Sequence, residues 1–405
     1  MPNSICSSAD HPNRWLGVTA GFLGWALDGF DYFAVVFLVE ALARQFSVDK
    51  AAIVLTLTVT LAMRPVGALV FGALSDLFGR RGALIGNVVF FTVVEVLCGF
   101  APDYGVFLFL RALFGIGMGG EWGVGASLVM ETVPVRWRGF FSGFLQCGYS
   151  VGYLLAAVAA RFVLPAWGWR AMFWVGSVPA LVVLAACARM PEPEAWRRHR
   201  ASNSTAIVRT ISHSWKVFGY LVVLMTLMML VSHGSQDLYP DFLGTAHHLS
   251  PSAVSVTAIL YNCGAILGSI AFGMISQRAG RRAGMTWAFA LSLLVLPLWA
   301  FGGSAVELAI ASFIMQIGVQ GAWGIVPAHL IELAPASARS LLPGLAYQLG
   351  ILLAAPTDII EYALRGLIGY GWALAGFEAV ALAASIVVIN LGWERHGRDF
   401  AEADE

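Results

Sequence analysis

The chain has 405 residues, of which 59% are hydrophobic and 12% are charged, and its formal net charge is zero. Soluble globular domains carry about 25% charged residues, and a water-soluble core of this size cannot bury so much apolar surface. The composition therefore predicts an integral membrane protein in a lipid bilayer. Because the chain has no polybasic or acidic tail, we expect no nucleic acid as a partner.

Twelve apolar stretches are long enough to cross a bilayer, which takes roughly 20 residues. We expect them at 16–40, 51–74, 82–101, 105–128, 140–163, 170–188, 217–241, 252–275, 283–302, 306–327, 341–364 and 371–393. The predicted fold class is an all-α integral membrane protein with twelve transmembrane helices in two pseudo-symmetric halves of six.

One longer polar stretch, 190–214, separates six spans from six. We therefore expect an N-terminal half over residues 1–189, a cytoplasmic linker over 190–214 and a C-terminal half over 215–405. The orientation follows from Lys and Arg, which gather in the loops on one side of the membrane. The other side holds only Arg44, Lys50, Arg161, Arg170 and Arg365. The bias predicts that both termini face the cytoplasm of a plasma or inner membrane.

The two halves repeat at a constant offset of 201 residues. The offset pairs Arg80 with Arg281, Arg81 with Arg282, Trp122 with Trp323 and Glu131 with Glu332. Two six-span halves of like orientation are typical of secondary transporters, in which the substrate site lies between the halves near the middle of the membrane.

The loop after the second span reads Gly72-Ala-Leu-Ser-Asp-Leu-Phe-Gly-Arg-Arg81. It resembles the signature loop of the major facilitator superfamily. The fourth span has Arg111 followed by glycines at 115, 117, 119 and 120, which is similar to a second signature of that superfamily.

Within the superfamily, the sequence is most similar to the sialate/lactate:proton symporter family. The likeness is carried by stretches 21–31, 63–67, 111–123 and 232–240. The last resembles the seventh-span signature of the lactate and short-chain carboxylate branch, except that Met229 and Asp241 stand where that signature has Asn and Thr. Glu121 is more similar to the sialate branch. The resemblance implies proton-coupled transport of a small organic anion.

Charges inside spans cost roughly 2.5–3.5 kcal/mol each on insertion scales, so they need partners and commonly mark function. Arg64 lies near the middle of the second span and offers a planar fork of donors, which a carboxylate matches with two hydrogen bonds. Arg64 is therefore a candidate for substrate binding. The alternative is a structural ion pair with Asp28 or Asp31 of the first span.

His233 and Asp237 are four residues apart and share a helix face. Histidine titrates near neutral pH, which suits a proton carrier. The alternative is a hydrogen-bonded interior histidine. Ser232, Ser235 and Gln236 lie beside the pair and are candidates for hydrogen bonds to the substrate, or to neighbouring helices.

Three further carboxyl groups are candidates for proton coupling. Asp28 and Asp31 lie three residues apart in the first span, so that one can hold a proton while the other pairs with Arg64. Glu121 in the fourth span is the third candidate. A fixed ion pair without a transport role is the alternative for the two aspartates.

Acidic and basic residues recur together at the cytoplasmic ends of both halves. We predict that they form a gate that breaks and re-forms as the halves rock. The alternative is that the basic residues serve only to orient the chain in the membrane. The predicted gate comprises Asp76, Arg80, Arg81, Glu131, Arg281, Arg282 and Glu332.

The sequence thus predicts a proton-coupled symporter of a small monocarboxylate such as lactate or pyruvate, working by alternating access. A sialic acid or other acidic-sugar symporter is the alternative. No clustered nucleophile and base or metal-ligand spacing stands out, so we expect no enzyme activity, no cofactor and no metal. The predicted partners are the organic anion, protons and the bilayer, and we expect a monomer.

Overall fold

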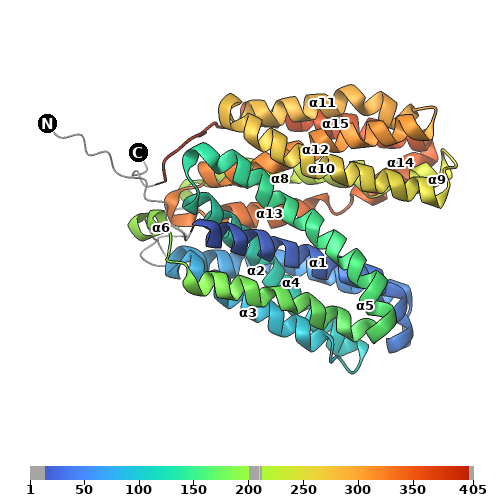
Figure 1. Ribbon diagram of the computed structural model, residues 1–405. Coiled ribbons are helices and arrows are strands. Elements are labelled where there is room, and N and C mark those ends of the chain that lie inside the picture. The colour runs from blue at the N-terminus through green and yellow to red at the C-terminus, as the bar shows by residue number, and fades with distance from the viewer. Residues whose placement is uncertain (1–13, 200–208, 210–211, 401–405) are drawn as a thin grey trace.

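The computed structural model describes residues 14–199, 209 and 212–400 (Figure 1). This part of the chain is helical, with no strand. In chain order the helices are α1 (Arg14–Phe46), α2 (Lys50–Phe78), α3 (Arg80–Cys98), α4 (Tyr104–Thr132), α5 (Arg138–Arg189), α6 (Glu194–His199), α8 (Trp215–Gln236), α9 (Tyr239–Thr245), α10 (Pro251–Ala279), α11 (Arg281–Phe301), α12 (Ala305–Leu333), α13 (Leu341–Ala354), α14 (Thr357–Ile368) and α15 (Tyr370–Leu391). Short 3-10 turns, Val135–Trp137 and Ala336–Ala338, precede α5 and α13.

The helices account for all twelve predicted spans. In the described residues, nine helices are long and apolar enough to cross a membrane. Gly168 turns the chain inside α5 with φ 76°, so this element supplies two spans. The seventh span is α8 with α9, and the eleventh is α13 with α14; each is broken between its two helices. The predicted fold class of twelve transmembrane helices in two halves is confirmed.

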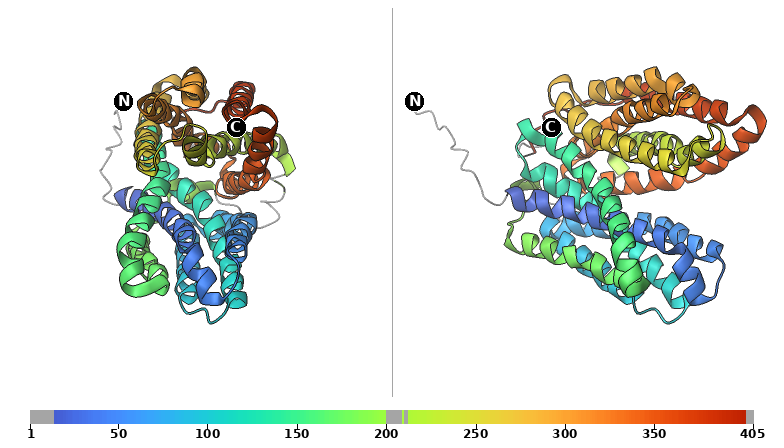
Figure 2. Two further views of the ribbon diagram at one scale, coloured as in Figure 1. Left: turned by 90° about the vertical axis from the view of Figure 1, so that its right-hand side faces the viewer. Right: turned by 45° about the vertical axis from the view of Figure 1, so that its right-hand side comes forward.

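Helices α1 to α5 form one bundle and α8 to α15 form a second (Figure 1). The bundles lie together at the end that carries α6, here called the α6 end. They diverge toward the opposite end, which carries α9 and is called the α9 end (Figure 2). Part of the predicted linker, residues 200–208 and 210–211, lies outside the described residues.

Glycines bring the two bundles into backbone contact near the α6 end. A Cβ added at Gly139 of α5 would lie 2.2 Å from the carbonyl oxygen of Gly273 of α10, and one at Gly143 would lie 2.2 Å from that of Ser269. A Cβ at Gly123 of α4 would lie 2.8 Å from the Cα atom of Gly344 of α13. Small residues at such crossings let helices approach closely, as membrane helices require when lipid offers no hydrophobic driving force.

The hydrophobic core is also continuous across this contact. Trp25 and Trp122 of the first bundle belong to the same buried cluster as Trp323 and Tyr347 of the second. The two bundles therefore share a packed core toward the α6 end.

Candidate functional site

Arg64 is buried between the bundles, and no described residue is its hydrogen-bond or ion-pair partner. Its side chain is 3% exposed, and neither Nε nor Nη2 has an acceptor within hydrogen-bond distance. Its helix packs tightly against α4, because a Cβ at Gly119 would lie 1.9 Å from the Arg64 carbonyl oxygen. The guanidinium thus keeps free donors in the core of the membrane, where unused donors are costly.

Two carboxyl groups lie beside Arg64, and they too lack hydrogen-bond partners in the described part of the chain. Asp28 of α1 and Glu121 of α4 are within electrostatic range of Arg64, and their four side-chain oxygens accept no hydrogen bond. Gly24 makes room for Glu121, since a Cβ there would lie 2.2 Å from Glu121 Oε1. One cation and two carboxyl groups therefore meet in one buried place.

Asp31 pairs with Arg111, not with Arg64 as one interpretation of the sequence suggested. Arg111 of α4 donates a 2.6 Å hydrogen bond from Nη1 to Asp31 Oδ2, and both side chains are buried. Glu95 of α3 lies within electrostatic range of both residues. The ion pair between Arg64 and Asp31 that the sequence offered as an alternative is therefore absent, and Arg111 with Glu95 surrounds Asp31 instead.

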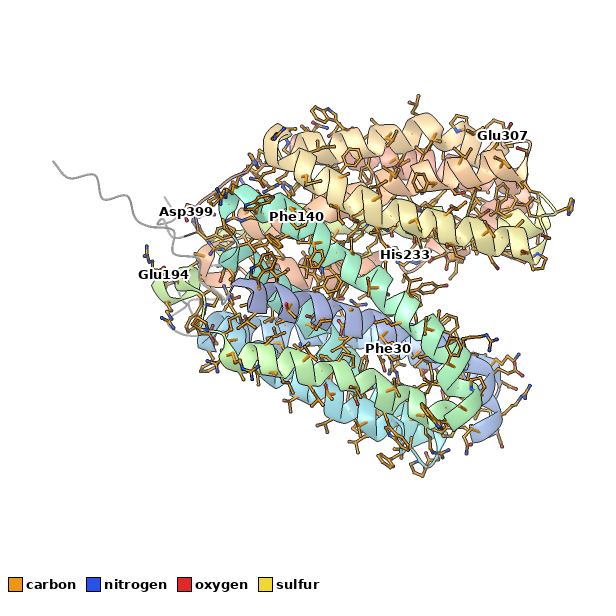
Figure 3. All side chains as sticks on the ribbon, viewed as in Figure 1. Phe30, Phe140, Glu194, His233, Glu307 and Asp399 are labelled. Atoms are coloured by element: carbon orange, nitrogen blue, oxygen red, sulfur yellow. The ribbon has the colours of Figure 1, made fainter. Side chains whose placement is uncertain are left out.

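His233 and Asp237 form the expected pair on one helix face. His233 Nδ1 and Asp237 Oδ2 are 2.7 Å apart, and the side chains are 39% and 41% exposed. The helix ends directly afterwards, with Asp237 at the C-cap of α8, before α9 begins at Tyr239. Figure 3 labels His233 between the two bundles.

The polar residues around this pair contact one another and α12. Gln236 Nε2 donates to Ser232 Oγ at 3.2 Å, and Gln320 Nε2 donates to the same oxygen at 3.4 Å. Gln316 Nε2 donates to Ser235 Oγ at 3.2 Å. Neither glutamine was predicted from the sequence, although they lie four residues apart in a largely apolar span.

Aromatic side chains connect Arg64 with the pair on α8. Tyr32 of α1 lies within electrostatic range of both Arg64 and Asp237. Its ring packs edge to face on Phe33 at 5.3 Å, and Phe33 packs on Tyr149 of α5 at 5.4 Å. These aromatic residues were not predicted, because a tyrosine in a span carries no charge that marks it.

A buried aromatic layer lies between Arg64 and the α6 end. Tyr347 of α13 stacks on Trp122 of α4 with ring centroids 4.2 Å apart. Trp25 and Trp323 meet Tyr347 edge to face at 5.9 and 5.7 Å. All four side chains are at most 4% exposed, so the path from Arg64 to the α6 end is closed here.

Ion pairs at the α6 end cross between the bundles. Arg138 of α5 donates to Glu332 of α12 at 3.1 Å, and Arg339 donates to Glu131 of α4 at 3.3 Å. Asp76 accepts from the backbone N–H groups of residues 340 and 341, which open α13, at 3.1 and 3.0 Å. An acidic side chain at a helix N-terminus is stabilised by the free N–H groups and the helix dipole. Two ion pairs and one contact between a carboxylate and a helix N-terminus thus hold this end together.

Each bundle also has an internal pair that supports these contacts. Arg80 binds Asp76 and reaches Glu131 at 3.0 Å, while Arg281 reaches Glu332 at 2.9 Å. The two remaining members of the predicted gate lie apart from the interface. Arg81 donates to the carbonyl oxygen of residue 188, and Arg282 donates to that of residue 389, each within its own bundle.

The segment after α15 lies across the same contacts. The ring of Phe400 is 3% exposed, with the guanidinium carbon of Arg138 3.9 Å and that of Arg339 4.3 Å from its centroid. Arg138 also donates to the carbonyl oxygen of residue 398 at 2.8 Å. Phe400 therefore touches one arginine from each bundle.

The comparisons with known proteins identify the family. Residues 21–236 match the Major Facilitator Superfamily, and residues 213–393 match the family described as "Sugar (and other) transporter". The chain belongs to the major facilitator superfamily. Membership makes it a multi-pass membrane transport protein, in agreement with the twelve helices.

Relatives in the superfamily carry organic acids, according to their names. The chain is 31% identical to a probable 4-methylmuconolactone transporter of Cupriavidus pinatubonensis over 98% of this chain and 95% of the relative. It is 29% identical to a carboxylic acid transporter protein homolog of Saccharomyces cerevisiae over 86% of this chain, which spans 61% of that longer protein. It is 23% identical to a sialic acid transporter of Escherichia coli over 96% of each.

Solved structures show the superfamily fold. The structure of the proton:xylose symporter XylE aligns over 96% of this chain and 98% of its own, with a TM-score of 0.75 and 19% identity. A human organic anion transporter aligns with a TM-score of 0.74 and 16% identity over 94% of this chain and 100% of its own.

Asp241 and Met229, the two residues that depart from the lactate-branch signature, both pack within the second bundle. Asp241 of α9 accepts a 2.8 Å hydrogen bond from the Tyr370 hydroxyl and a 3.2 Å one from Arg365. Met229 is 5% exposed within the core of the second bundle. Asp241 thus ties α9 to α14 and α15 at the α9 end.

Proposed function

We propose that this protein carries a small monocarboxylate together with protons across the cell membrane by alternating access. The observation that carries the proposal is the buried, unpaired Arg64 with two unpaired carboxyl groups beside it. A guanidinium with free donors binds a carboxylate bidentately. The organic acids in the names of several relatives support the same substrate class.

The charges around Arg64 can couple the binding of the anion to the binding of protons. Arg64 balances one negative charge, which can be that of the substrate or that of Asp28 or Glu121. Two like charges about 4 Å apart repel each other by about 4 kcal/mol at the effective dielectric constant near a protein surface. A carboxylate therefore binds Arg64 best when Asp28 and Glu121 are protonated, so that anion and proton enter together.

We propose that this arrangement of the bundles is the state that faces outward. The positive-inside bias supports a cytoplasmic location for the α6 end. That end is sealed by the aromatic layer and by Asp76, Arg80, Glu131, Arg281 and Glu332, which we propose act as the cytoplasmic gate with Arg138 and Arg339. His233 and Asp237 are half-exposed nearer the α9 end, where a proton from outside can reach them.

Lactate and pyruvate are the substrates that the sequence resemblance implies. A second candidate is an aromatic monocarboxylate, because Tyr32, Phe33 and Tyr149 lie beside the proposed anion site and offer ring faces. A transporter of 4-hydroxybenzoate from Pseudomonas putida is 30% identical over 49% of this chain and 45% of the relative. Sialic acid is the remaining candidate.

Uptake into proteoliposomes tests the proposal. Labelled lactate, pyruvate, 4-hydroxybenzoate and sialic acid are offered with the outside more acidic than the inside. We expect one or more of the monocarboxylates to accumulate above its external concentration, and a protonophore to abolish the accumulation. Equal uptake with and without the pH gradient would rule out proton coupling, and no exchange of any carboxylate would rule out the substrate class.

A further inference from the structure

Two buried glutamates of the second bundle have no role in the site around Arg64. Glu361 of α14 and Glu378 of α15 are both 0% exposed. No donor of the described residues lies within hydrogen-bond distance of any of their four carboxyl oxygens. These are unpartnered polar side chains in a membrane-embedded core.

The groups that face these glutamates are acidic. Asp358 of the same helix and Asp237 of α8 lie within electrostatic range of Glu361, and Glu361 lies within range of Glu378. Tyr370 at the start of α15 is also in range of Glu361. Helix α11, which packs against α15, adds no charged group in range. Arg365, four residues after Glu361 on α14, donates instead to Asp241 and lies over the ring of Tyr370.

Without a cation or a donor, neither glutamate can remain ionised at low cost. Moving an unpaired ion into such an interior costs several kcal/mol even after relaxation. Repulsion from the neighbouring carboxylates adds to this cost. The two side chains therefore hold protons in the state that the structure describes.

The two glutamates lie next to the helix that carries the half-exposed pair His233 and Asp237. Gly234, the residue after His233, makes room for Glu378, because a Cβ there would lie 2.8 Å from Glu378 Oε2. Asp237 lies within electrostatic range of Glu361, and Asp358, which is also in range of Glu361, is exposed. A proton on Asp237 or His233 can therefore pass to Glu361 and from there to Glu378.

Two of the three spans that carry this cluster are interrupted beside it, whereas α15 is continuous. Helix α8 ends at Gln236 before α9 begins, and α13 ends at Ala354 before α14 begins at Thr357. Discontinuous helices near the middle of transporters are common at ion and substrate sites. Movement of α14 relative to α8 would change the separation and the solvation of the cluster.

We propose that Glu361 and Glu378 form a second proton-binding site, in the second bundle, which exchanges protons with the outside through His233 and Asp237. In each exchange the O–H bond of one carboxylic acid breaks and one forms on the neighbouring carboxylate. The proposal rests on the proposed function and adds to it: the transporter then moves one proton more than the site at Arg64 alone requires.

The first test measures protonation directly and needs no substrate. Infrared difference spectra of the purified full-length protein between acid and alkaline pH report the C=O stretch of carboxylic acids that lose their protons. We expect a band that Glu378→Gln and Glu361→Gln each reduce, while Glu307→Gln, the same change at an exposed residue of the same bundle, leaves it intact. Glu378→Asp should retain a shifted band, which separates a lost proton site from a misfolded protein.

The second test measures how many protons accompany the anion. Labelled lactate or 4-hydroxybenzoate, whichever the wild type accumulates, is taken up at zero membrane potential with a pH difference of about one unit. Each coupled proton then multiplies the accumulation ratio by about ten. Glu378→Gln should therefore accumulate about tenfold less than the wild type and Glu307→Gln.

The outcomes of the two tests separate the inference from the proposed function. A carboxylic acid band that neither glutamine variant changes overturns the second proton site, whatever the transport result. Unchanged accumulation ratios in both variants, with a functioning wild type, overturn its role in transport. Failure of the wild type to exchange any carboxylate overturns the proposed function and leaves the infrared result to decide on the proton site.

Discussion

Arg111 and Asp31 bind each other across α4 and α1, so Asp31 is not the partner of Arg64, which has none among the residues that the structure describes. We expect Asp31→Asn to lower the free energy of unfolding by about 3 kcal/mol, because Arg111 would remain buried with an unmatched charge. Thermal unfolding of the detergent-solubilised protein measures the change. The control is Glu40→Gln, which removes an exposed partner of Arg44 and should leave the unfolding temperature nearly unchanged. An equal effect of the two changes would contradict the structural importance of the buried pair.

Arg64→Lys should weaken carboxylate binding by about tenfold, which corresponds to about 1.4 kcal/mol. The positive charge remains, but the planar fork that matches a carboxylate is lost. Competition binding with the accepted labelled carboxylate measures the affinity. Arg81→Lys makes the same change at a residue whose side chain donates to the carbonyl oxygen of residue 188, away from Arg64, and should bind as the wild type does. Unchanged affinity in Arg64→Ala would remove Arg64 from the anion site.

His233→Gln should lower uphill accumulation driven by a pH gradient while exchange of substrate across the membrane stays measurable. Glutamine keeps a polar side chain on this face of α8 but cannot take up a proton. Counterflow and pH-driven uptake in the same proteoliposomes separate the two activities. Full accumulation in both His233→Gln and Asp237→Asn would exclude the pair from proton coupling and leave Glu121, Asp28 and Asp31 as the candidates.

Phe400→Ala should shift the protein toward the state that opens at the α6 end. The ring contacts Arg138 and Arg339, and a cation–π contact contributes about 0.5–2 kcal/mol depending on its burial. A cysteine placed at Ser340, where both bundles meet, should therefore react several-fold faster with a thiol reagent in the Phe400→Ala background. Phe400→Trp keeps a ring and should preserve the slow reaction. Equal rates in all backgrounds would show that the ring does not stabilise the closed end.

The orientation in the membrane can be tested with single cysteines in a cysteine-free background. A membrane-impermeant reagent should label position 247, between α9 and α10, in sealed cells. It should not label position 203, which lies in the predicted linker and outside the described residues. External labelling at 203 would invert the topology and with it the assignment of the gate.

The spans could be predicted from the sequence because each is an apolar run whose length is dictated by the bilayer. The expected span 105–128 became α4 at Tyr104–Thr132, and 283–302 became α11 at Arg281–Phe301. The predicted pair of His233 and Asp237 also formed, because residues four apart on a helix are neighbours in any tertiary structure.

The partners of the other buried charges could not be predicted in the same way. Asp31 and Arg111 lie 80 residues apart, and their contact depends on how α1 and α4 rotate against each other. Glu378 lies in a long apolar run of the last span and was overlooked as an intramembrane charge. Its importance appears only when α8 and α14 are packed around it.

The glycines at the contact of α5 and α10 have a consequence for the balance between conformations. A methyl group at position 139 or 143 has no room while the bundles touch, but neither bundle needs the glycine for its own helices. Gly139→Ala would therefore destabilise only the conformer in which α5 and α10 touch. Glycines at this contact thus favour that conformer, and adding a single methyl group is a way to shift the population toward the conformer that is open at the α6 end.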